Sequence, residues 1–339
     1  MKHLRNLCIL AAACLAFGLA TPARAIDTSE PAVAAFITKM VQDHHFDRKA
    51  LTGLLAETPF DPDVIERMES PAEALPWSRY RAIFVTPERI AAGSAFVSEH
   101  RQTLAAAKKK YGVPASVIAA IIGIESHFGR YKGDFSALSA LATLAFDYPR
   151  RADFFRRELA KYLLLCRKNG FDPRALESSY AGALGAGQFI PSSYLAYAVD
   201  ADGDGSDMFS SWPDIVSSVA NYLAVHGWKA GKPVVARAQL EPSADPDHLA
   251  GRELPARELR TAGIAFGADV AGNTSVRLVE VEVQEGGSEE TQYWVGLPNF
   301  LVIMRYNHSP LYALAASQLA AAIARASASD EAALAARQR

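Results

Sequence analysis

The amino-acid sequence predicts a mainly α fold of the α+β class, in which a small β-sheet domain is inserted between helical parts. Residues 31–111 carry apolar positions at helical spacing and are interrupted by proline. Within this stretch Thr86 is typical of a helix N-cap and Pro87 of the first helical position. Residues 114–228 also follow a helical pattern and are rich in glycine, alanine and serine. These two stretches make the predicted fold mainly helical.

The chain changes character after residue 228. Residues 275–284 alternate apolar and polar side chains, as a half-buried strand does, and a turn-like Glu-Gly-Gly-Ser sequence follows them. Residues 292–295, of which all but Gln292 are apolar or aromatic, and the apolar residues 300–304 are expected to complete the small sheet. An alanine-rich stretch, from residue 313 to about residue 326, then predicts a last helix before a polar tail.

Composition sets limits on the kind of protein. Half of the 339 residues are hydrophobic and 21% are charged, which excludes disorder as the main state. The 35 basic and 37 acidic residues nearly cancel, so a bulk electrostatic grip on nucleic acid is not expected. The sequence contains no apolar run of 18 residues, the length that would predict a membrane-spanning helix.

The N-terminus is typical of a secretory signal. Lys2 and Arg5 precede an apolar stretch from Leu7 to Ala20, and Ala23-Arg24-Ala25 has the small-x-small pattern of a cleavage site. We expect residues 1–25 to be removed. The removed segment holds three basic residues and no acid, so the mature chain has 32 basic and 37 acidic residues and a net charge of -5.

Cysteine usage leaves two hypotheses for the N-terminus. Cys8 and Cys14 lie in the signal, so the mature chain keeps only Cys166 and cannot form an internal disulfide. Cys166 follows an apolar run and is expected to be a buried thiol. Cys14 follows three alanines and loosely resembles a lipoprotein processing site, so an outer-membrane lipoprotein is the alternative to a free exported protein.

One acidic residue lies on the apolar stripe of a predicted helix. This helix opens at Pro114, and Gly129 is its expected C-terminal cap. Glu125 continues the stripe formed by Ile118, Ile121 and Ile122. A carboxyl group on a buried face has a raised pKa, as a general acid near neutral pH requires. The alternative is that the helix end faces solvent and Glu125 pairs with Arg130 or another surface base.

Small residues dominate the segment 178–191, which also contains Tyr180 and Gln188. The order of its glycines is wrong for a phosphate-binding loop, and no predicted strand precedes it. Close packing of helices would explain the glycines. A sugar-binding wall would also require close backbone approach together with an amide side chain, so composition leaves both hypotheses open.

A third segment resembles the first half of an EF-hand calcium loop. Asp200, Asp202 and Asp204 stand at positions 1, 3 and 5, with glycine at position 6. Position 12 is Ser211, where a bidentate glutamate is expected. Asp207 or Asp214 would have to substitute. The segment therefore predicts either a structural calcium site or an Asp/Gly turn before a helix that begins near Pro213.

In combination these segments resemble the lytic murein transglycosylase B family, glycoside hydrolase family 103. The matching stretches run in one order along nearly the whole mature chain and include residues 111–114, 123–129, 140–152, 180–194, 218–228, 292–300 and 305–309. The resemblance implies a lysozyme-like helical catalytic core. It predicts an N-terminal helical region at 26–111, the core at 112–230, the β insertion at 231–304, and a helix with a polar tail that returns to the core at 305–339.

The resemblance also implies an activity and a set of site residues. The family cleaves the β-1,4 bond between MurNAc and GlcNAc in peptidoglycan without water and leaves a 1,6-anhydro ring. Glu125 would act as acid and then as base, with no cofactor needed for the chemistry. Ser179, Tyr180 and Gln188 would bind the glycan. Arg150 and Arg151 would hold peptide or lactyl carboxylates. The cleft would be lined by Tyr80, Tyr222, Tyr306, Asn307 and Tyr312.

Two rival functions also fit the sequence. A peptidoglycan-binding scaffold that has lost catalysis would not need Glu125. A hydrolysing muramidase would need a positioned water and normally a second carboxylate, for which Asp134 and Asp147 are the nearest in sequence. The expected location is the periplasm of a Gram-negative bacterium. The expected partners are peptidoglycan glycan strands and cell-wall synthesis or envelope machinery, with the protein itself a monomer.

Overall fold

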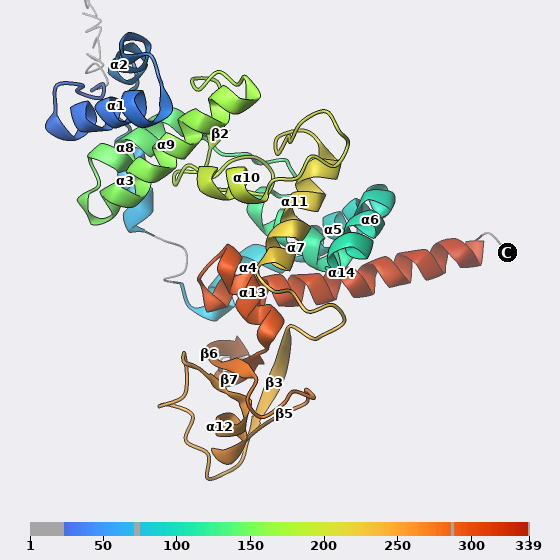
Figure 1. The fold of residues 1–339 in the computed structure, drawn as a ribbon. Coiled ribbons are helices and arrows are strands. Elements are labelled where there is room, and N and C mark those ends of the chain that lie inside the picture. The colour runs from blue at the N-terminus through green and yellow to red at the C-terminus, as the bar shows by residue number, and fades with distance from the viewer. Residues whose placement is uncertain (1–23, 71–74, 286–287, 338–339) are drawn as a thin grey trace, which may run out of the picture.

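The computed structural model describes residues 24–70, 75–285 and 288–337 of the chain (Figure 1). The described part is mainly helical with a small antiparallel sheet, which confirms the predicted fold class. Its first six helices are α1 (Pro31–His44), α2 (Arg48–Ala56), α3 (Pro62–Glu69), α4 (Trp77–Phe84), α5 (Pro87–Glu99) and α6 (Arg101–Tyr111). Thr86 caps α5 as predicted, because its side chain accepts a hydrogen bond from the Arg89 amide and Pro87 begins the helix.

The next part of the chain is also helical. It contains α7 (Ala115–Ser126), α8 (Ala137–Phe146), a short 3-10 turn (Pro149–Arg151), α9 (Ala152–Asn169), α10 (Pro191–Tyr197) and α11 (Trp212–Val225). Two short strands, β1 (Phe135–Ser136) and β2 (Glu177–Ser178), pair with each other beside α8. Cys166 in α9 is buried, as its apolar neighbours predict.

The first six helices belong to two different packing groups. Helices α1 to α3 lie with α8 and α9, where the ring of Phe36 in α1 meets the ring of Phe146 in α8 at 5.8 Å. Helices α4 to α6 instead pack on α7, α11 and the C-terminal helix α14 (Pro310–Arg337). Figure 1 shows the first group at the upper left and the second around the centre. The packing therefore divides the helices between α3 and α4, on either side of residues 71–74.

The last helix of the chain lies against the buried helix α7. Nine of the twelve residues of α7 are buried, so this helix needs apolar neighbours on nearly every side. Helix α14 supplies one of them, since its residues Tyr312 to Leu319 bury all but one side chain. It continues to Arg337, and the polar tail predicted after residue 326 is therefore helical. Alanine, arginine and glutamate, which favour helices, make up most of that tail.

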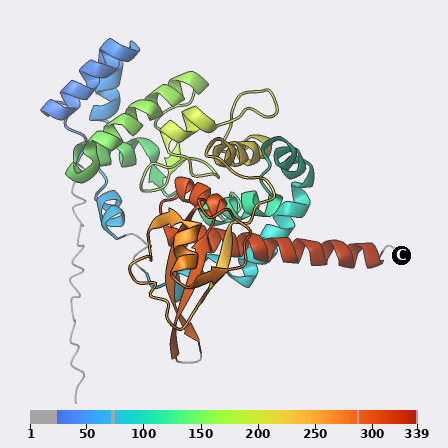
Figure 2. The ribbon, with the colours of Figure 1, turned by 60° about the horizontal axis from the view of Figure 1, so that its bottom comes forward.

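The small sheet has five strands in the order β4-β6-β7-β3-β5. They are β3 (Val235–Leu240), β4 (Glu253–Pro255), β5 (Ile264–Phe266), β6 (Ser275–Glu285) and β7 (Ser288–Gly296), with α12 (Ala256–Thr261) between β4 and β5. In Figure 1 the sheet lies below most of the helices, and Figure 2 brings it to the front; its contacts with the helical part include those with α4 and α13. One face packs on a core of its own around Leu259, Val276 and Val295, while Val279 and Val281 join the main core.

The sheet leaves and rejoins the helical part at adjacent positions. Strands β3 and β7 pair with Val235 opposite Gly296, and the Leu297 amide donates to the Val234 carbonyl at 3.0 Å. Asn299 is fully buried and bonds the backbone of Lys229 and Lys232 through its side-chain amide. The two connections are thus tied together.

The prediction of a strand at residues 300–304 is wrong. These residues lie in α13 (Pro298–Tyr306), which begins with Pro298 in its first turn and buries Phe300, Val302 and Ile303. A continuous apolar run of five residues has no periodicity that separates a buried strand from a buried helix. The preceding proline is the local signal that favours the helix.

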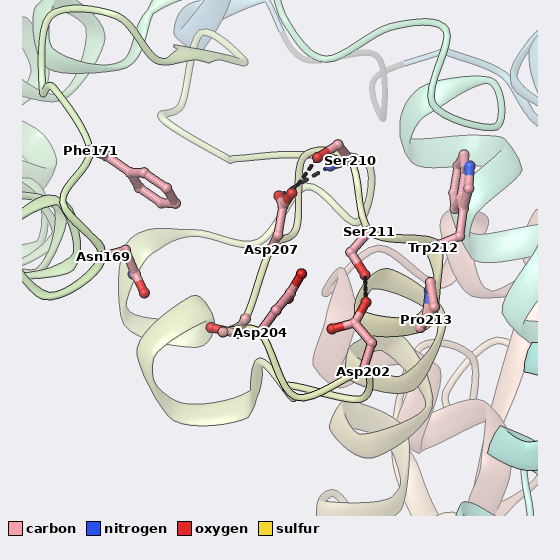
Figure 3. Close-up of a pocket in the computed structure, with 11 residues that line it drawn as sticks. Asn169, Phe171, Asp202, Asp204, Asp207, Ser210, Ser211, Trp212 and Pro213 are labelled. Atoms are coloured by element: carbon pink, nitrogen blue, oxygen red, sulfur yellow. Dashed lines mark hydrogen bonds between the residues drawn. The ribbon is translucent and has the colours of Figure 1, made fainter.

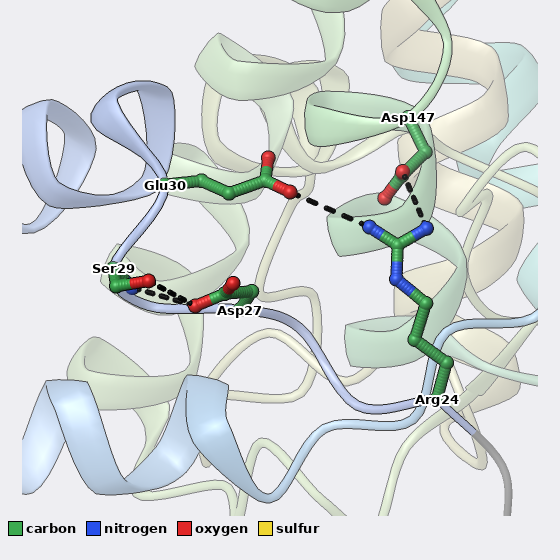
Figure 4. Close-up of polar contacts among 5 residues, drawn as sticks. All are labelled: Arg24, Asp27, Ser29, Glu30 and Asp147. Carbon is green, nitrogen blue, oxygen red and sulfur yellow. Dashed lines mark hydrogen bonds and ion pairs between the residues drawn. The ribbon is translucent and has the colours of Figure 1, made fainter.

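Most of the predicted signal sequence, Cys14 included, lies outside the described residues. The described chain begins with Arg24, whose guanidinium lies 3.4 Å from the Glu30 carboxylate and 3.3 Å from that of Asp147 (Figure 4). The Ile26 amide donates to the Thr58 carbonyl at 2.9 Å. Among the helices within the described ranges, none combines the length and the apolar character that crossing a membrane requires.

Candidate active site

Glu125 lies half-buried in the last turn of α7, on the face that also holds three fully buried isoleucines. The helix ends at Ser126, and His127 is its C-cap, in place of the predicted Gly129. Three successive residues have left-handed backbones, with φ of 49° at His127, 60° at Phe128 and 79° at Gly129. Two of them are not glycine, and such strain persists only where the surroundings fix the backbone.

Packing and polar contacts fix this turn. The Phe128 ring folds back beneath α7 so closely that a Cβ on Gly123 would lie 2.6 Å from it. The Ser126 hydroxyl donates to the Ile122 carbonyl and accepts from the Gly129 amide, both at 3.0 Å. Outside the helix, Nη2 of the buried Arg89 lies 2.5 Å from Nε2 of His127. The turn therefore holds the end of the helix that carries Glu125.

His127 is an exposed residue. Burial of part of its ring and the charges of Arg89 and Arg130 lower the pKa of His127. Arg89 can only donate hydrogen bonds, so Nε2 of His127 accepts and carries no proton in this contact. Sequence reasoning missed Arg89, because nothing in its local sequence distinguishes it from a surface arginine.

A tyrosine from the other end of the chain contacts Glu125. The Tyr312 hydroxyl, in the first turn of α14, donates to Oε1 of Glu125 at 2.5 Å. Tyr312 is 2% exposed, and burial together with the nearby Glu125 charge raises its pKa well above 10.0. The phenol therefore keeps its proton and is a permanent donor to one carboxyl oxygen.

A cluster of aromatic rings extends from this pair. Tyr306 in α13 donates to the Gly187 carbonyl at 2.5 Å, and burial and the Glu125 charge also raise its pKa. Its ring lies 4.9 Å from the ring of Tyr222 in α11, whose hydroxyl donates to the Arg305 carbonyl at 2.5 Å. Burial raises the pKa of Tyr222 to about 12. These hydroxyls tie α11 and α13 to the small-residue segment.

The small-residue segment is shaped by close packing. A Cβ on Gly182 would lie 2.4 Å from the side chain of Leu141, and one on Gly185 would lie 2.2 Å from the Met208 carbonyl oxygen. Packing thus accounts for these two glycines, one of the two hypotheses left open by the sequence. Gln188 has a left-handed backbone with φ of 49° and is half-buried. Its side-chain amide donates to the Gly185 carbonyl at 2.9 Å.

The other residues predicted to bind the glycan or its carboxylates are half-buried in the small-residue segment or exposed before α9. The half-buried Ser179 accepts hydrogen bonds at its hydroxyl from the amides of Ala181 and Ala183, and Tyr180 beside it is also half-buried. Arg150 and Arg151 are exposed on the 3-10 turn before α9, and the Arg151 guanidinium stacks on Phe154 at 4.3 Å.

Tyr80 and Asn307 belong to elements that adjoin the tyrosine pair. Tyr80 is 1% exposed in α4, and its charge contributes to the raised pKa of Tyr312, which places the two rings close together. Asn307 follows α13 directly and accepts a hydrogen bond from the Ser309 amide at 3.0 Å. The structure thus gathers Glu125, Tyr80, Tyr306, Tyr312 and Tyr222 from five helices.

The acidic loop, residues 200–211, and the start of α11 bring four carboxylates together. Oxygens of Asp200, Asp202, Asp204 and Asp214 all lie within 4.8 Å of one another. Asp214 is fully buried at the start of α11 and accepts hydrogen bonds from the amides of Ala201 and Asp207, both at 2.7 Å. A shared proton and the repulsion of Asp202 raise the pKa of Asp204.

Of the two acids that the sequence offered as substitutes, Asp214 lies beside the other three carboxylates. The Asp207 carboxylate instead accepts hydrogen bonds from the backbone amides of Phe209 and Ser210, and Figure 3 shows it turned toward Ser210. Ser211 donates to Asp202 at 2.7 Å and caps α11. A cavity of about 580 Å³ adjoins the loop and is lined by Asp202, Asp204 and Trp212 among others (Figure 3).

These carboxylates fit a calcium ion. Calcium binds oxygen at about 2.3–2.6 Å, so oxygens on opposite sides of one ion lie up to about 5 Å apart. The four acids satisfy this spacing, and carboxylate oxygens are the ligands that a hard cation prefers. Asp200, Asp202, Asp204 and Asp214 are the residues that would hold it.

Glu125 offers a carboxyl group with one oxygen engaged by a permanent donor, beside a set of buried aromatic rings. Comparison with known families identifies the chain: the model described as the transglycosylase SLT domain matches residues 28–321. The chain belongs to this lytic transglycosylase family. The family that the sequence motifs resemble is thereby confirmed.

Relatives of the family match most of the chain. Membrane-bound lytic murein transglycosylase B of Escherichia coli (strain K12) is 39% identical over 306 residues, which are 87% of this chain and 83% of the relative. The structure of soluble lytic transglycosylase SltB1 from Pseudomonas aeruginosa is 43% identical, with a TM-score of 0.80, and covers 87% of this chain and 99% of its own. The Escherichia coli lytic transglycosylase Slt35 in complex with calcium is 39% identical, with a TM-score of 0.80, covering 90% and 96%.

Proposed function

We propose that the protein is a peptidoglycan lytic transglycosylase in which Glu125 is the single acid and base. The observation that carries the assignment is the hydrogen bond from Tyr312 to Glu125. Since the phenol occupies Oε1 as a donor, a protonated Glu125 must carry its own proton on Oε2. The acidic proton is thereby assigned to one oxygen before substrate binds, which is the positioning that general acid catalysis requires.

The reaction follows in two proton transfers. Oε2 of Glu125 gives its proton to the glycosidic oxygen as the bond to C1 of MurNAc breaks, and the leaving GlcNAc takes that oxygen as a hydroxyl. The positive charge at C1 is stabilised by the neighbouring 2-acetamido group. Glu125, now a carboxylate held by Tyr312, accepts the proton of the C6 hydroxyl as that oxygen attacks C1. A 1,6-anhydro ring forms and Glu125 regains its proton.

A second carboxylate is not needed in this scheme, whereas hydrolysis by two acids requires one. Of the two acids nearest in sequence, Asp134 has another partner, since its carboxylate accepts a hydrogen bond from the Tyr131 hydroxyl at 3.1 Å. Glu125 is the acid whose charge acts on both Tyr306 and Tyr312. This favours the transglycosylase over a hydrolysing muramidase.

Product analysis tests the proposal. Purified sacculi are incubated with the mature protein, with Glu125→Gln, and with Glu177→Gln, an exposed glutamate that serves as the matched control. We expect anhydro-muropeptides from the wild type and from Glu177→Gln, and at least a thousandfold slower release by Glu125→Gln. Products with ordinary reducing ends would refute the mechanism in favour of hydrolysis. Sacculus binding without any product would favour a scaffold.

We also propose that the acidic loop binds one structural calcium ion, supported by the spacing of its four carboxylates. Calcium at a hundred times its Kd would add about 2.7 kcal/mol to the stability of a folded state that alone binds it. The test is thermal unfolding with calcium and with chelator, for the wild type and for Asp202→Asn combined with Asp204→Asn. A calcium-dependent rise in Tm is expected for the wild type only. An equal rise in Asp245→Asn, an exposed acid elsewhere, checks that the loss is local.

For the location we propose the periplasm, reached by the N-terminal signal, with peptidoglycan strands as the partner and a monomer as the working unit. Labelling of the mature N-terminus distinguishes cleavage after Ala25 from lipid attachment at Cys14. Size-exclusion chromatography with light scattering tests the monomer. Association with cell-wall or envelope machinery is a further expectation that co-purification from cross-linked cells would test.

A further inference from the structure

A second cavity, of about 770 Å³, lies where the sheet meets the helical part. Its walls come from α4, α5 and α14 on one side and from β3, β6 and β7 on the other. A cavity of this size can hold a ligand of several hundred daltons. The lining includes two tryptophans, two arginines and two glutamines that could contact a polar ligand: Trp77, Trp294, Arg81, Arg325, Gln292 and Gln318. None of them belongs to the Glu125 site.

The cavity is nevertheless a neighbour of that site. Helix α4 turns Tyr80 toward Tyr312 and presents Trp77 and Arg81 to the cavity. Helix α14 turns Tyr312 toward Glu125 and presents Gln318 and Arg325 to the cavity. At about 1.5 Å per residue, Gln318 lies about 9 Å and Arg325 about 20 Å along the helix from Tyr312. Each of the two helices therefore contributes one face to the Glu125 site and another face to the cavity.

The charged side chains that line the cavity are basic. Arg81 and Arg325 line the cavity, and among the described residues no aspartate or glutamate does, although acids outnumber bases in the whole chain. Nε of Arg81 donates to Oε1 of Gln318 at 2.7 Å, which fixes the guanidinium across the gap between α4 and α14. Ion pairs between described side chains do not include Arg81 or Arg325. The lining is thus complementary to carboxylates, which guanidinium groups bind with paired hydrogen bonds.

The other walls suit a peptide. Two of the four tryptophans of the chain lie here, Trp77 at 4% exposure and Trp294 half-buried. Nε1 of Trp294 is buried, and no described residue accepts its hydrogen bond, an arrangement that costs about 1–3 kcal/mol unless an acceptor is supplied. Gln292 and Gln318 carry side-chain NH2 groups that can donate to peptide carbonyls, while their amide oxygens accept from Arg237 and Arg81.

From these observations we propose that this cavity binds the carboxylate-bearing stem peptide of peptidoglycan, at a site separate from the one where the glycan bond is cleaved. The inference rests on the proposed function, which supplies the substrate class. An extended peptide spans about 3.3–3.6 Å per residue, so four residues cover about 14 Å, enough to reach across the roughly 10 Å along α14 that separates Gln318 from Arg325. Binding here holds the sacculus against the enzyme by a stem while Glu125 acts on a glycan strand.

The first test uses a free stem tetrapeptide without sugar and the full mature chain, with binding followed by tryptophan fluorescence. We expect saturable binding with a fluorescence change that Trp294→Phe largely removes. The same peptide with its carboxylates amidated should bind the wild type at least tenfold more weakly. Equal binding of the two peptides would overturn the proposal. This comparison uses only the wild-type protein, so it does not depend on whether a variant folds.

The second test separates the cavity from the arginines at the 3-10 turn. Arg81→Gln combined with Arg325→Gln should raise the Kd at least tenfold, while Arg79→Gln, an exposed arginine on the same helix outside the lining, should change it less than twofold. Arg150→Gln with Arg151→Gln should leave the fluorescence change intact. If that pair abolishes it, or if an unrelated acidic peptide binds as tightly as the stem, the proposal is wrong.

The two proposals can fail separately. Release of anhydro-muropeptides by the wild type with no saturable stem binding would reject this site and leave the transglycosylase standing. Stem binding at the cavity in a protein whose products have ordinary reducing ends would reject the mechanism and leave the binding site.

Discussion

Replacing Tyr312 by phenylalanine removes a hydroxyl that donates to Oε1 of Glu125 at 2.5 Å and keeps the buried ring. Hydrogen bonds to a charged partner are worth about 1.5–3 kcal/mol. In the proposed reaction this bond stabilises Glu125 as it becomes a carboxylate. Its loss should therefore slow kcat by about 10- to 150-fold, at 1.36 kcal/mol for each factor of ten, with KM little changed.

The assay is the initial rate of anhydro-muropeptide release from sacculi at several substrate concentrations. Tyr162→Phe is the matched control, because Tyr162 is also fully buried and its hydroxyl donates to the Pro173 carbonyl at 2.7 Å. That variant should lose a few degrees of Tm and keep its kcat within about twofold. If Tyr312→Phe retains more than half of the wild-type kcat, or if Tyr162→Phe loses as much, the role given to the Tyr312 hydroxyl is refuted.

The remaining predictions concern stability. His127 has a pKa lowered from its usual 6.5, so the unfolded chain takes up the proton first as the pH falls; stability from the neutral ring is complete above pH 6.5 and declines below it, down to the folded pKa. His127→Asn, which keeps a residue suited to the left-handed backbone, should flatten this part of the Tm profile, and an unchanged slope would contradict the argument. Gly133→Ala would place a Cβ 1.9 Å from the Ser178 carbonyl oxygen at a φ of 116°, so it should lower the Tm by several degrees more than Gly170→Ala, which meets no atom within 4 Å at a φ of 69°. Similar losses in both variants would mean that backbone conformation alone decides the effect.

The position of Glu125 is a feature that local sequence could predict. Its spacing from Ile118, Ile121 and Ile122 places it on the buried face of a helix, and the structure has it there. Its partner Tyr312 lies 187 residues away, and helical periodicity carries no information over that distance. Only the resemblance to a known family named that tyrosine among the site residues.

Other differences have local causes. The helix C-cap fell on His127 because the Phe128 ring packs under Gly123, a tertiary contact that outweighs the preference of glycine for that position. The fourth acid of the carboxylate cluster, Asp214, follows the twelve residues of the motif and lies at the start of the next helix. The continuous apolar run of residues 300–304 favours a strand, and it outweighs the helix-start signal of Pro298, at which α13 begins.

The way in which the sheet joins the helical part bears on how such a protein can change over time. The chain departs and returns through the paired residues Val235 and Gly296, and Asn299 fastens the two connections to each other. The outer strands β4 and β5 lie at the edges of the sheet, away from this junction. Descendants could therefore lengthen, shorten or exchange the sheet, and so alter what the enzyme adheres to, while the helices that carry Tyr222 and Tyr306 keep their spacing.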